Sequence, residues 1–238
     1  MKRHNVEWTP EKIGTYWDFI SATTQPENYF TYAAGAAVAS HVAREVALTG
    51  RDVLDFGCGP GHLFRHLVKR APTIRYFGMD FSPGSVEHLR RQWGTQPQFI
   101  GAAAVGSFPV TLDRTFDVIV CCEVIEHLDD TTLEHVCAAF TRLLRPGGTL
   151  YMTTPNNEDL TRNATMCPDC GATFHRWQHM RTWNARSLVA QMARHGFTNH
   201  RTLELVYGKN WLHSELVTRA RRAMGKPQPN LCYIGTRT

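Results

Sequence analysis

The stretch DVLDFGCGPG, residues 52–61, joins a short apolar run to a glycine-rich turn. An apolar run of this length that stops at glycines is typical of a buried parallel strand, and the helix-like segment HLFRHLVKRA follows it. Glycines let backbone amides approach a ligand at the positive end of the next helix. The stretch therefore predicts a strand, a turn and a helix with a nucleotide-like cofactor at the turn.

Strand-like and helix-like segments alternate on either side of this unit, which predicts a parallel sheet covered by helices. The strands are expected at 52–56, 74–80, 98–101, 116–122, 149–155, 202–208 and 231–236. The length of 238 residues suits one domain. We divide it into an N-terminal cap (1–35), a cofactor-binding core (36–155), a lid insertion without clear periodicity (156–183) and a C-terminal part of the sheet (184–238).

Composition narrows the class of protein. Hydrophobic residues make up 42% of the chain, which is enough to build a sizeable core. No apolar run approaches the ~18 residues of a membrane span, and the first residues lack the core of a signal peptide, so we expect a cytoplasmic protein without membrane contact. The net charge of +5 identifies no partner. Seven cysteines, an odd number, argue against a disulfide framework and leave thiols available for metal.

Two acids accompany the glycine turn. Asp55 precedes the glycines, where its charge would repel a pyrophosphate but attract a cationic amino-acid head group. Asp80 closes the second expected strand, where it can accept hydrogen bonds from a ribose diol. Alternatively, the turn has only a structural role and binds no ligand, and Asp80 is an acid that caps the following helix.

Four segments together resemble the successive motifs of class I S-adenosylmethionine-dependent methyltransferases. They are VLDFGCGPG at 53–61, GMDFS at 78–82, FDVIVCCEVIEHL at 116–128 and LLRPGGTLYMTTPN at 143–156. The likeness covers about residues 36–200 and implies a Rossmann-like α/β fold. The sheet of that family has seven strands in the order 3-2-1-4-5-7-6, and its seventh strand is antiparallel.

The resemblance also implies which residues bind S-adenosylmethionine. Asp55 and the turn would hold the methionine portion, and Asp80 the ribose. Many relatives place an acid near the adenine after the third strand, whereas this chain has Gly101-Ala102-Ala103-Ala104, so adenine contacts would come from backbone or from Phe81. The expected cofactor contacts are Asp55, Gly57, Cys58, Gly59, Gly61, Asp80, Phe81 and Glu123.

Glu123, Glu126 and His127 follow the fourth strand, at the edge of the sheet where such folds bind ligands. A helical turn there would bring the three side chains to one face, as a partial shell for Mg²⁺, Mn²⁺ or a similar ion. Alternatively, Glu123 faces the substrate while the other two only cap the next helix. The E-x-x-E-H segment is similar to the metal motif of small-RNA 3′-terminal 2′-O-methyltransferases and to a segment of ubiquinone-biosynthesis O-methyltransferases. The first likeness implies His179 as a fourth ligand.

A second candidate metal site lies in the lid. Cys167, Cys170, His175 and His179 form C-x2-C-x4-H-x3-H, a compact spacing that suits tetrahedral Zn²⁺. Alternatively, the two cysteines are reduced and unligated. His179 cannot serve both sites. Either zinc takes Cys167, Cys170, His175 and another ligand while His179 joins the acidic cluster, or the chain has one metal site and the other group binds no metal.

These features predict an enzyme that transfers a methyl group to a hydroxyl, with Glu123, Glu126 and His127 as catalytic residues and His127 or Glu126 accepting the proton. A small molecule or sugar would bind under the lid and the aromatic cap, which holds Tyr16, Trp17, Tyr29, Phe30 and Tyr32. The alternative acceptor is RNA, bound by Arg176, Arg181, Arg186 and the basic helix 213–226, unless Leu216, Val217 and Ala220 turn that helix toward the sheet and its arginines only face water. A third possibility is a non-catalytic subunit that binds the cofactor.

Overall fold

The computed structural model describes residues 2–23, 26–106 and 110–238. Within this part of the chain, one sheet has seven strands in the order β4-β3-β2-β5-β6-β10-β9. The strands are β2 (Asp52–Phe56), β3 (Arg75–Asp80), β4 (Phe99–Ala104), β5 (Phe116–Cys122), β6 (Leu144–Pro155), β9 (Phe197–Leu205) and β10 (Asn230–Arg237). Counted along the chain this is the order 3-2-1-4-5-7-6, and β10 is antiparallel to both neighbours. The predicted topology is confirmed.

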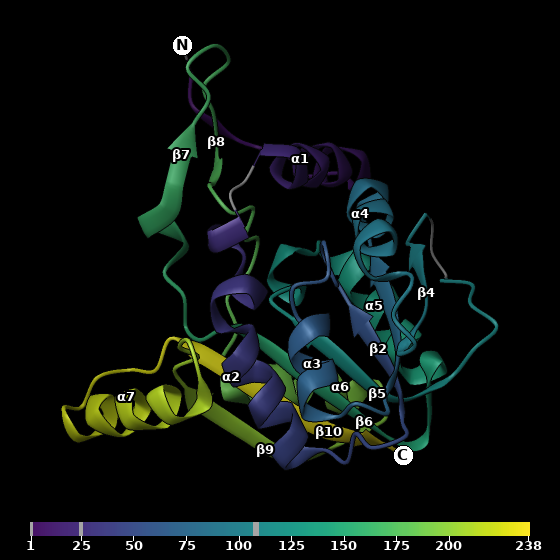
Figure 1. The fold of residues 1–238 in the computed structure, drawn as a ribbon. Helices are drawn as coiled ribbons and strands as arrows, with labels where there is room; N and C mark the ends of the chain where they lie inside the picture. Colours follow the sequence, from purple (N-terminus) through teal and green to yellow (C-terminus); the bar gives the residue numbers. More distant parts are fainter. Residues whose placement is uncertain (1, 24–25, 107–109) are drawn as a thin grey trace.

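Helices cover both faces of the sheet (Figure 1). One face carries α2 (Phe30–Glu45), α3 (Phe64–Arg70) and α4 (Pro83–Trp93), and the other carries α5 (Asp130–Leu143) and α6 (Ala185–Arg194). Side chains of β2 alternate between the two layers, with Val53 in the first apolar core and Leu54 and Phe56 in the second. Burial on both sides explains why β2 reads as a continuous apolar run.

The cap and the lid form one substructure rather than two. The lid contains the short helix η3 (Leu160–Asn163) and the hairpin of β7 (Ala164–Met166) and β8 (Ala172–His175). The N-terminal strand β1 (His4–Asn5) pairs in parallel with β8 and so makes a three-stranded sheet. Helix α1 (Pro10–Thr23) then crosses above the main sheet, before η1 (Pro26–Asn28). The ordered hairpin differs from the structureless insertion that the sequence suggested.

Several boundaries also differ from those expected. Strand β6 begins at Leu144, because Leu144 pairs with Phe116 and Thr149 with Val118 while the Pro-Gly-Gly segment bulges between them. The segment 33–50, whose apolar spacing predicts a helix ending at Gly50, forms helix α2 only as far as Glu45. Strand β9 begins five residues earlier than predicted, at Phe197, and follows the long antiparallel β10.

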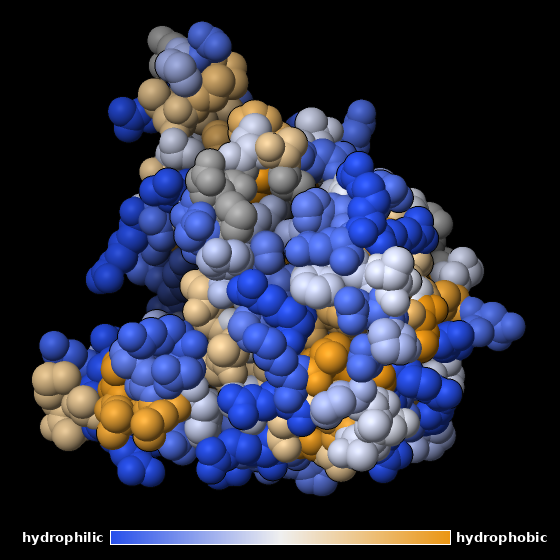
Figure 2. Space-filling model, in the orientation of Figure 1, coloured by the Kyte–Doolittle hydropathy of each residue, from blue (hydrophilic) through white to orange (hydrophobic). Residues whose placement is uncertain are grey.

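Helix α7 (Trp211–Ala223) is turned differently from the interpretation in which its apolar residues face the sheet. Its buried side chains are Ser214 and Thr218, whose hydroxyls donate to or accept from neighbouring backbone, whereas Leu216 is 57% exposed. Figure 2 shows apolar side chains gathered over this projecting helix at the lower left. Among the described residues, no helix combines the length and apolarity needed to cross a membrane.

Candidate active site

A cavity of about 270 Å³ lies at the carboxyl ends of the parallel strands, beneath α1. One side is formed by the glycine turn and the end of β3, with Gly57, Gly59, Asp80 and Phe81. The other side is formed by Glu123, Glu126, His127 and His179. Ile13, Trp17, Ile20, Tyr29 and Phe30 from the N-terminal region complete its walls. The predicted cofactor turn and the predicted acidic cluster therefore face one shared space.

The glycine turn has the tight geometry that a bound cofactor requires. Gly57 has φ 76°, and a Cβ there would lie 2.2 Å from Cγ2 of Val124. Gly59 has φ 51°, and its N–H donates to Oδ2 of Asp80 at 2.8 Å. The other Asp80 oxygen accepts the Ser82 N–H at 2.8 Å. Asp80 thus fixes the turn and, as a lining residue, still faces the cavity.

Asp55 lies behind the turn rather than in the cavity wall. It is 2% exposed and accepts a hydrogen bond of 2.7 Å from the hydroxyl of Tyr76. Burial raises the pKa of Asp55 to about 7. Cys58 and Gly61 also stand outside the cavity wall, and Cys58 is buried against Gly78. Of the eight expected cofactor contacts, those that line the cavity are Gly57, Gly59, Asp80, Phe81 and Glu123.

Glu123, Glu126 and His127 all line the cavity but do not form one helical turn, and Glu123, although predicted as a ligand, lies outside the group of ligand atoms described below. Glu123 adopts the left-handed region, with φ 52°, and its N–H donates to Thr153 at the end of β6. The short helix η2 (Ile125–His127) then holds the other two side chains. Oε2 of Glu126 accepts the Thr154 hydroxyl at 3.0 Å, and its Oε1 lies 3.8 Å from Nε2 of His127. A strained non-glycine residue beside a cavity is typical of functional sites.

Burial leaves polar atoms of this cluster without partners. Glu123 Oε1, Glu126 Oε1 and His127 Nδ1 find no hydrogen-bond partner among the described residues. Burial raises the pKa of Glu123 to about 7, and burial with the nearby Glu123 raises that of Glu126 further. Burial lowers the pKa of His127 to about 3. Unpaired buried acids are costly, so the site as folded favours a bound cation or a proton.

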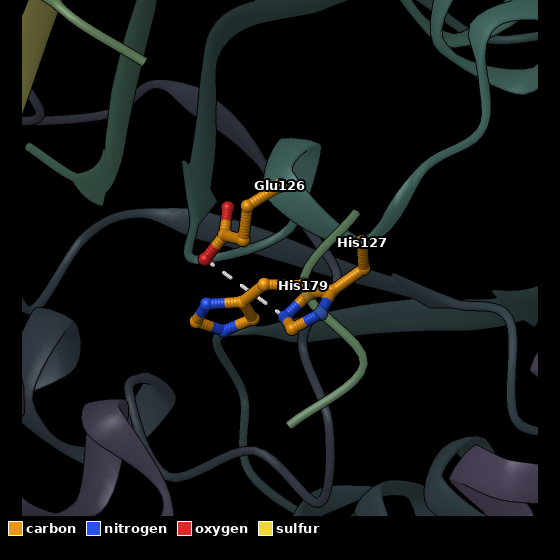
Figure 3. Close-up of side chains that lie close together, drawn as sticks. All are labelled: Glu126, His127 and His179. Atoms are coloured by element: carbon orange, nitrogen blue, oxygen red, sulfur yellow. Dashed lines mark ion pairs between the residues drawn. The ribbon is translucent and has the colours of Figure 1, made fainter. Parts of the chain in front are cut away.

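His179 completes the cluster from the loop after β8. A ligand atom from each of Glu126, His127 and His179 lies within 4.8 Å of the others, and Figure 3 shows the three side chains pointing toward one another. Nδ1 of His179 also contacts the carboxylate of Glu158. Glu158, His175 and His179 make a second group of the same kind.

Comparison with known proteins identifies the family of this chain. The methyltransferase domain family matches residues 29–202. The chain belongs to this family. The expected resemblance to class I S-adenosylmethionine-dependent methyltransferases is thereby confirmed.

Individual relatives share about a third or less of their residues with the matched part of this chain. The ubiquinone biosynthesis O-methyltransferase of Pseudomonas putida is 32% identical over 48% of this chain and 49% of its own length. That of Salmonella arizonae is 27% identical over 65% of this chain and 64% of its own length. The chain therefore spans about half to two thirds of these relatives. Among solved structures, the 1,6-didemethyltoxoflavin-N1-methyltransferase of Burkholderia thailandensis shares the fold, with a TM-score of 0.66, 15% identity and coverage of 99% of this chain and 93% of that one.

The second predicted metal set is not assembled in this member of the methyltransferase domain family. Cys167 and Cys170 lie in the turn between β7 and β8, whereas His175 is at the far end of β8. A strand rises about 3.3 Å per residue, so His175 is held away from the thiols while β8 stays paired. In the described part of the chain, His175 groups with Glu158 and His179 and not with cysteine.

Two residues that the sequence analysis missed hold this methyltransferase site together. Glu158 contacts both His175 and His179. Gln178 is fully buried with φ 58°; its amide nitrogen donates to the His127 carbonyl at 2.8 Å and its oxygen accepts the Trp17 indole N–H at 2.8 Å. Gln178 therefore ties the cap helix to the acidic cluster. Only its place between His175 and His179 in the sequence could have drawn attention to it.

Proposed function

We propose that the chain transfers a methyl group from S-adenosylmethionine to a hydroxyl of a small molecule, with help from a divalent metal ion. The observation that carries this proposal is the shared cavity, in which a glycine turn faces a cluster of buried acids and imidazoles. The activity of the whole protein is included in this proposal, because the O-methyltransferase relatives are matched over only part of their length.

The cofactor half of the cavity suits a nucleoside with an amino-acid tail. Bound S-adenosylmethionine would supply a methyl group on a sulfonium sulfur, a bond that breaks readily because the leaving group is a neutral thioether. Asp80 lines the space at the end of β3, where its carboxylate can accept ribose hydroxyls. Phe81 offers a flat apolar wall next to it. Gly57 and Gly59 leave room where side chains would block the approach to the backbone.

The acidic half of the cavity fits a divalent cation. Glu126, His127 and His179 would hold the ion, with Glu123 also lining the cavity, because carboxylate oxygens and imidazole nitrogens bind Mg²⁺, Mn²⁺ or Zn²⁺. Oε1 of Glu126 and Oε1 of Glu123 are buried without a hydrogen-bond partner in the described part of the chain. A cation there would supply Lewis acidity that lowers the pKa of an acceptor hydroxyl. The cation would also remove the repulsion between Glu123 and Glu126.

Glu123 is the best candidate for the proton acceptor in this proposal. It lines the cavity, and burial raises its pKa to about 7, close to the value that suits a general base at neutral pH. The pKa of His127, lowered to about 3, makes that ring a weak base but leaves it neutral, as a metal ligand must be. Glu126 and His127 thus suit ligation better than proton transfer.

The cap supports a small acceptor. Ile13, Trp17, Tyr29 and Phe30 enclose the cavity with apolar and aromatic surface. The O-methyltransferase relatives favour oxygen as the atom methylated, and the N-methyltransferase with the same fold keeps nitrogen as an alternative.

RNA remains the second candidate acceptor, but fewer arginines are available for it than predicted. Arg181 donates to the Leu128 carbonyl and pairs with Asp130 at 2.8 Å. On α7, Arg221 and Arg222 donate to backbone carbonyls at 2.6 Å. Arginines occupied in this way contribute less to phosphate binding.

The proposal is tested by transfer of labelled methyl from S-adenosylmethionine to cell extract. The extract is divided into an RNA fraction and a metabolite fraction, and each is assayed with and without EDTA. We expect label in the metabolite fraction and loss of transfer with EDTA, restored by Mn²⁺ or Mg²⁺. Glu126→Gln should keep S-adenosylhomocysteine binding and lose transfer, while the matched exposed change Glu87→Gln should alter neither. Cofactor binding without transfer to any fraction would instead favour a non-catalytic subunit.

A further inference from the structure

A groove opens from the candidate active site between α1 and the β7–β8 hairpin. Phe19 of α1 lines it on one side, and Arg162, Phe174 and Arg176 line it on the other. It shares Ile20, Asn28 and Trp177 with the cavity that holds Glu126 and His179. Because three residues line both hollows, the groove and the cavity are neighbours along one path.

The groove is positively charged. Arg162 and Arg176 line it, and no acidic residue is among its described lining residues. Arg176 lies over the Trp177 ring, 5.1 Å from its centroid, and no carboxylate of the described chain comes within ion-pair distance of it. Arg162 contacts Asp159 at 3.4 Å, but Arg162 is 82% exposed, and such pairs contribute little in water. Both guanidinium groups therefore remain open to an anion.

The groove also offers flat apolar surface. Phe19 is 63% exposed although it is a large aromatic residue, and Phe174 and Trp177 are partly buried beside the arginines. Tyr16 supports this wall, since its ring packs on Phe174 and its hydroxyl donates to the Arg176 carbonyl. The aromatic side chains beside the two arginines thus offer a flat apolar surface on which a planar ligand can pack.

The path therefore joins the candidate metal ligands Glu126 and His179 at one end to guanidinium groups at Arg162 and Arg176 at the other. We propose that the groove binds an oxyanion, a phosphate or a carboxylate, carried on a ring of the acceptor whose hydroxyl lies at the acidic end. The planar guanidinium group of arginine can donate two parallel hydrogen bonds to such an oxyanion, and the aromatic side chains can pack against the ring. This inference rests on the proposed function and names its class of substrate: an anionic ring compound.

The test measures binding and not methyl transfer. Phenyl phosphate, benzoate and the neutral benzyl alcohol are titrated by NMR into protein saturated with S-adenosylhomocysteine, which occupies the cofactor side. We expect both anions, or one of them, to bind about tenfold or more tightly than benzyl alcohol, with affinity falling as salt rises. The Arg162→Ala/Arg176→Ala double variant should lose about tenfold for the anions and little for the alcohol. Arg186→Ala, a matched change on α6 outside the groove, should bind all three as wild type does.

Equal binding of benzyl alcohol and the anions, or unchanged anion binding in the double variant, would overturn the inference. A single-stranded RNA oligonucleotide that binds far more tightly than phenyl phosphate, with a steep salt dependence, would also overturn it in favour of a nucleic-acid surface. Glu126→Gln is expected to bind the anions normally. A failure of the metal-assisted reaction would therefore leave the anion result intact, and the two proposals fail separately.

Discussion

His179 and Glu158 are joined through the Nδ1 atom of the histidine. The neighbouring His175 faces the same carboxylate with its Nε2, at 3.6 Å. Nδ1 of His175 accepts the backbone N–H groups of Trp177 and His179, at 3.4 and 3.2 Å, so its proton sits on Nε2. Glu158 thus accepts the Nδ1–H of His179, while Nε2 of His175 stays just beyond hydrogen-bond distance. This contact leaves Nε2 of His179 with a lone pair, the arrangement by which carboxylates orient histidine ligands.

Replacing Glu158 by Gln should weaken metal binding about 10- to 100-fold, because the amide no longer fixes the protonation of His179. Any bound metal is first removed with a chelator, and titration of the metal-free protein with Mn²⁺ or Zn²⁺ then measures the affinity. The variant should still fold, since Gln has the size of Glu, and Asp159→Asn next to it should bind metal normally. Undiminished affinity in Glu158→Gln would mean that His179 is not held as a ligand by this contact.

The glycine turn allows a comparison of two alanine substitutions. Gly57→Ala adds a Cβ 2.2 Å from Val124 and forces alanine to φ 76°, whereas Gly59→Ala at φ 51° meets nothing closer than 4.0 Å. Each left-handed alanine costs about 1 kcal/mol or more, and only Gly57→Ala adds a clash. We expect Gly57→Ala to unfold at clearly lower urea concentration than Gly59→Ala. Adding Val124→Ala should recover part of the loss, and no recovery would contradict the contact.

Asp55 predicts a pH dependence of stability in the protein without cofactor. Burial raises its folded pKa to about 7, so between about pH 4 and pH 7 the folded state holds a proton that the unfolded chain has released. Its stabilising contribution is complete below pH 4 and is lost as pH rises through 7; the upper limit is roughly 4 kcal/mol.

Asp55→Asn removes this titration, so its unfolding free energy should fall less between pH 5 and pH 8 than that of wild type. Urea denaturation at constant ionic strength measures the difference. Burial also raises the pKa of Asp80, so the unfolding free energy of both proteins should still fall somewhat over this pH range. An equal decline in the two proteins would show that Asp55 ionises normally in the folded state.

The cofactor turn was predictable because its signal is local, whereas the sheet order was predicted from the resemblance to the methyltransferase family. The run of apolar residues in β2 and the glycines after it lie within ten residues of sequence. The acidic cluster was predictable for the same reason, but its geometry was not. The left-handed Glu123 depends on its N–H bond to Thr153, which lies 30 residues away on β6.

The lid was harder to predict because long-range pairing shapes it. Strand β8 pairs with His4 and Asn5 near the N-terminus and with β7, and as an extended strand it places His175 at the opposite end from the cysteines. Spacing alone made C-x2-C-x4-H resemble one site, because it does not reveal an extended strand between the thiols and the imidazole. The exposed Leu216 on α7 has a similar origin: an amphipathic pattern gives two faces without saying which one meets the sheet.

The two cysteines of the hairpin turn provide the last prediction. Cys167 and Cys170 lie at the opposite end of β8 from His175, so Cys167→Ser/Cys170→Ser should leave metal affinity at Glu126, His127 and His179 unchanged. Elemental analysis of the double variant and its Mn²⁺ titration measure this directly. If the double variant contains one equivalent of zinc less than wild type while its Mn²⁺ titration stays normal, the turn binds its own ion with ligands other than His179. If the Mn²⁺ affinity falls with the thiols, His179 belongs to the cysteine site, and the assignment of His179 to the acidic cluster is wrong.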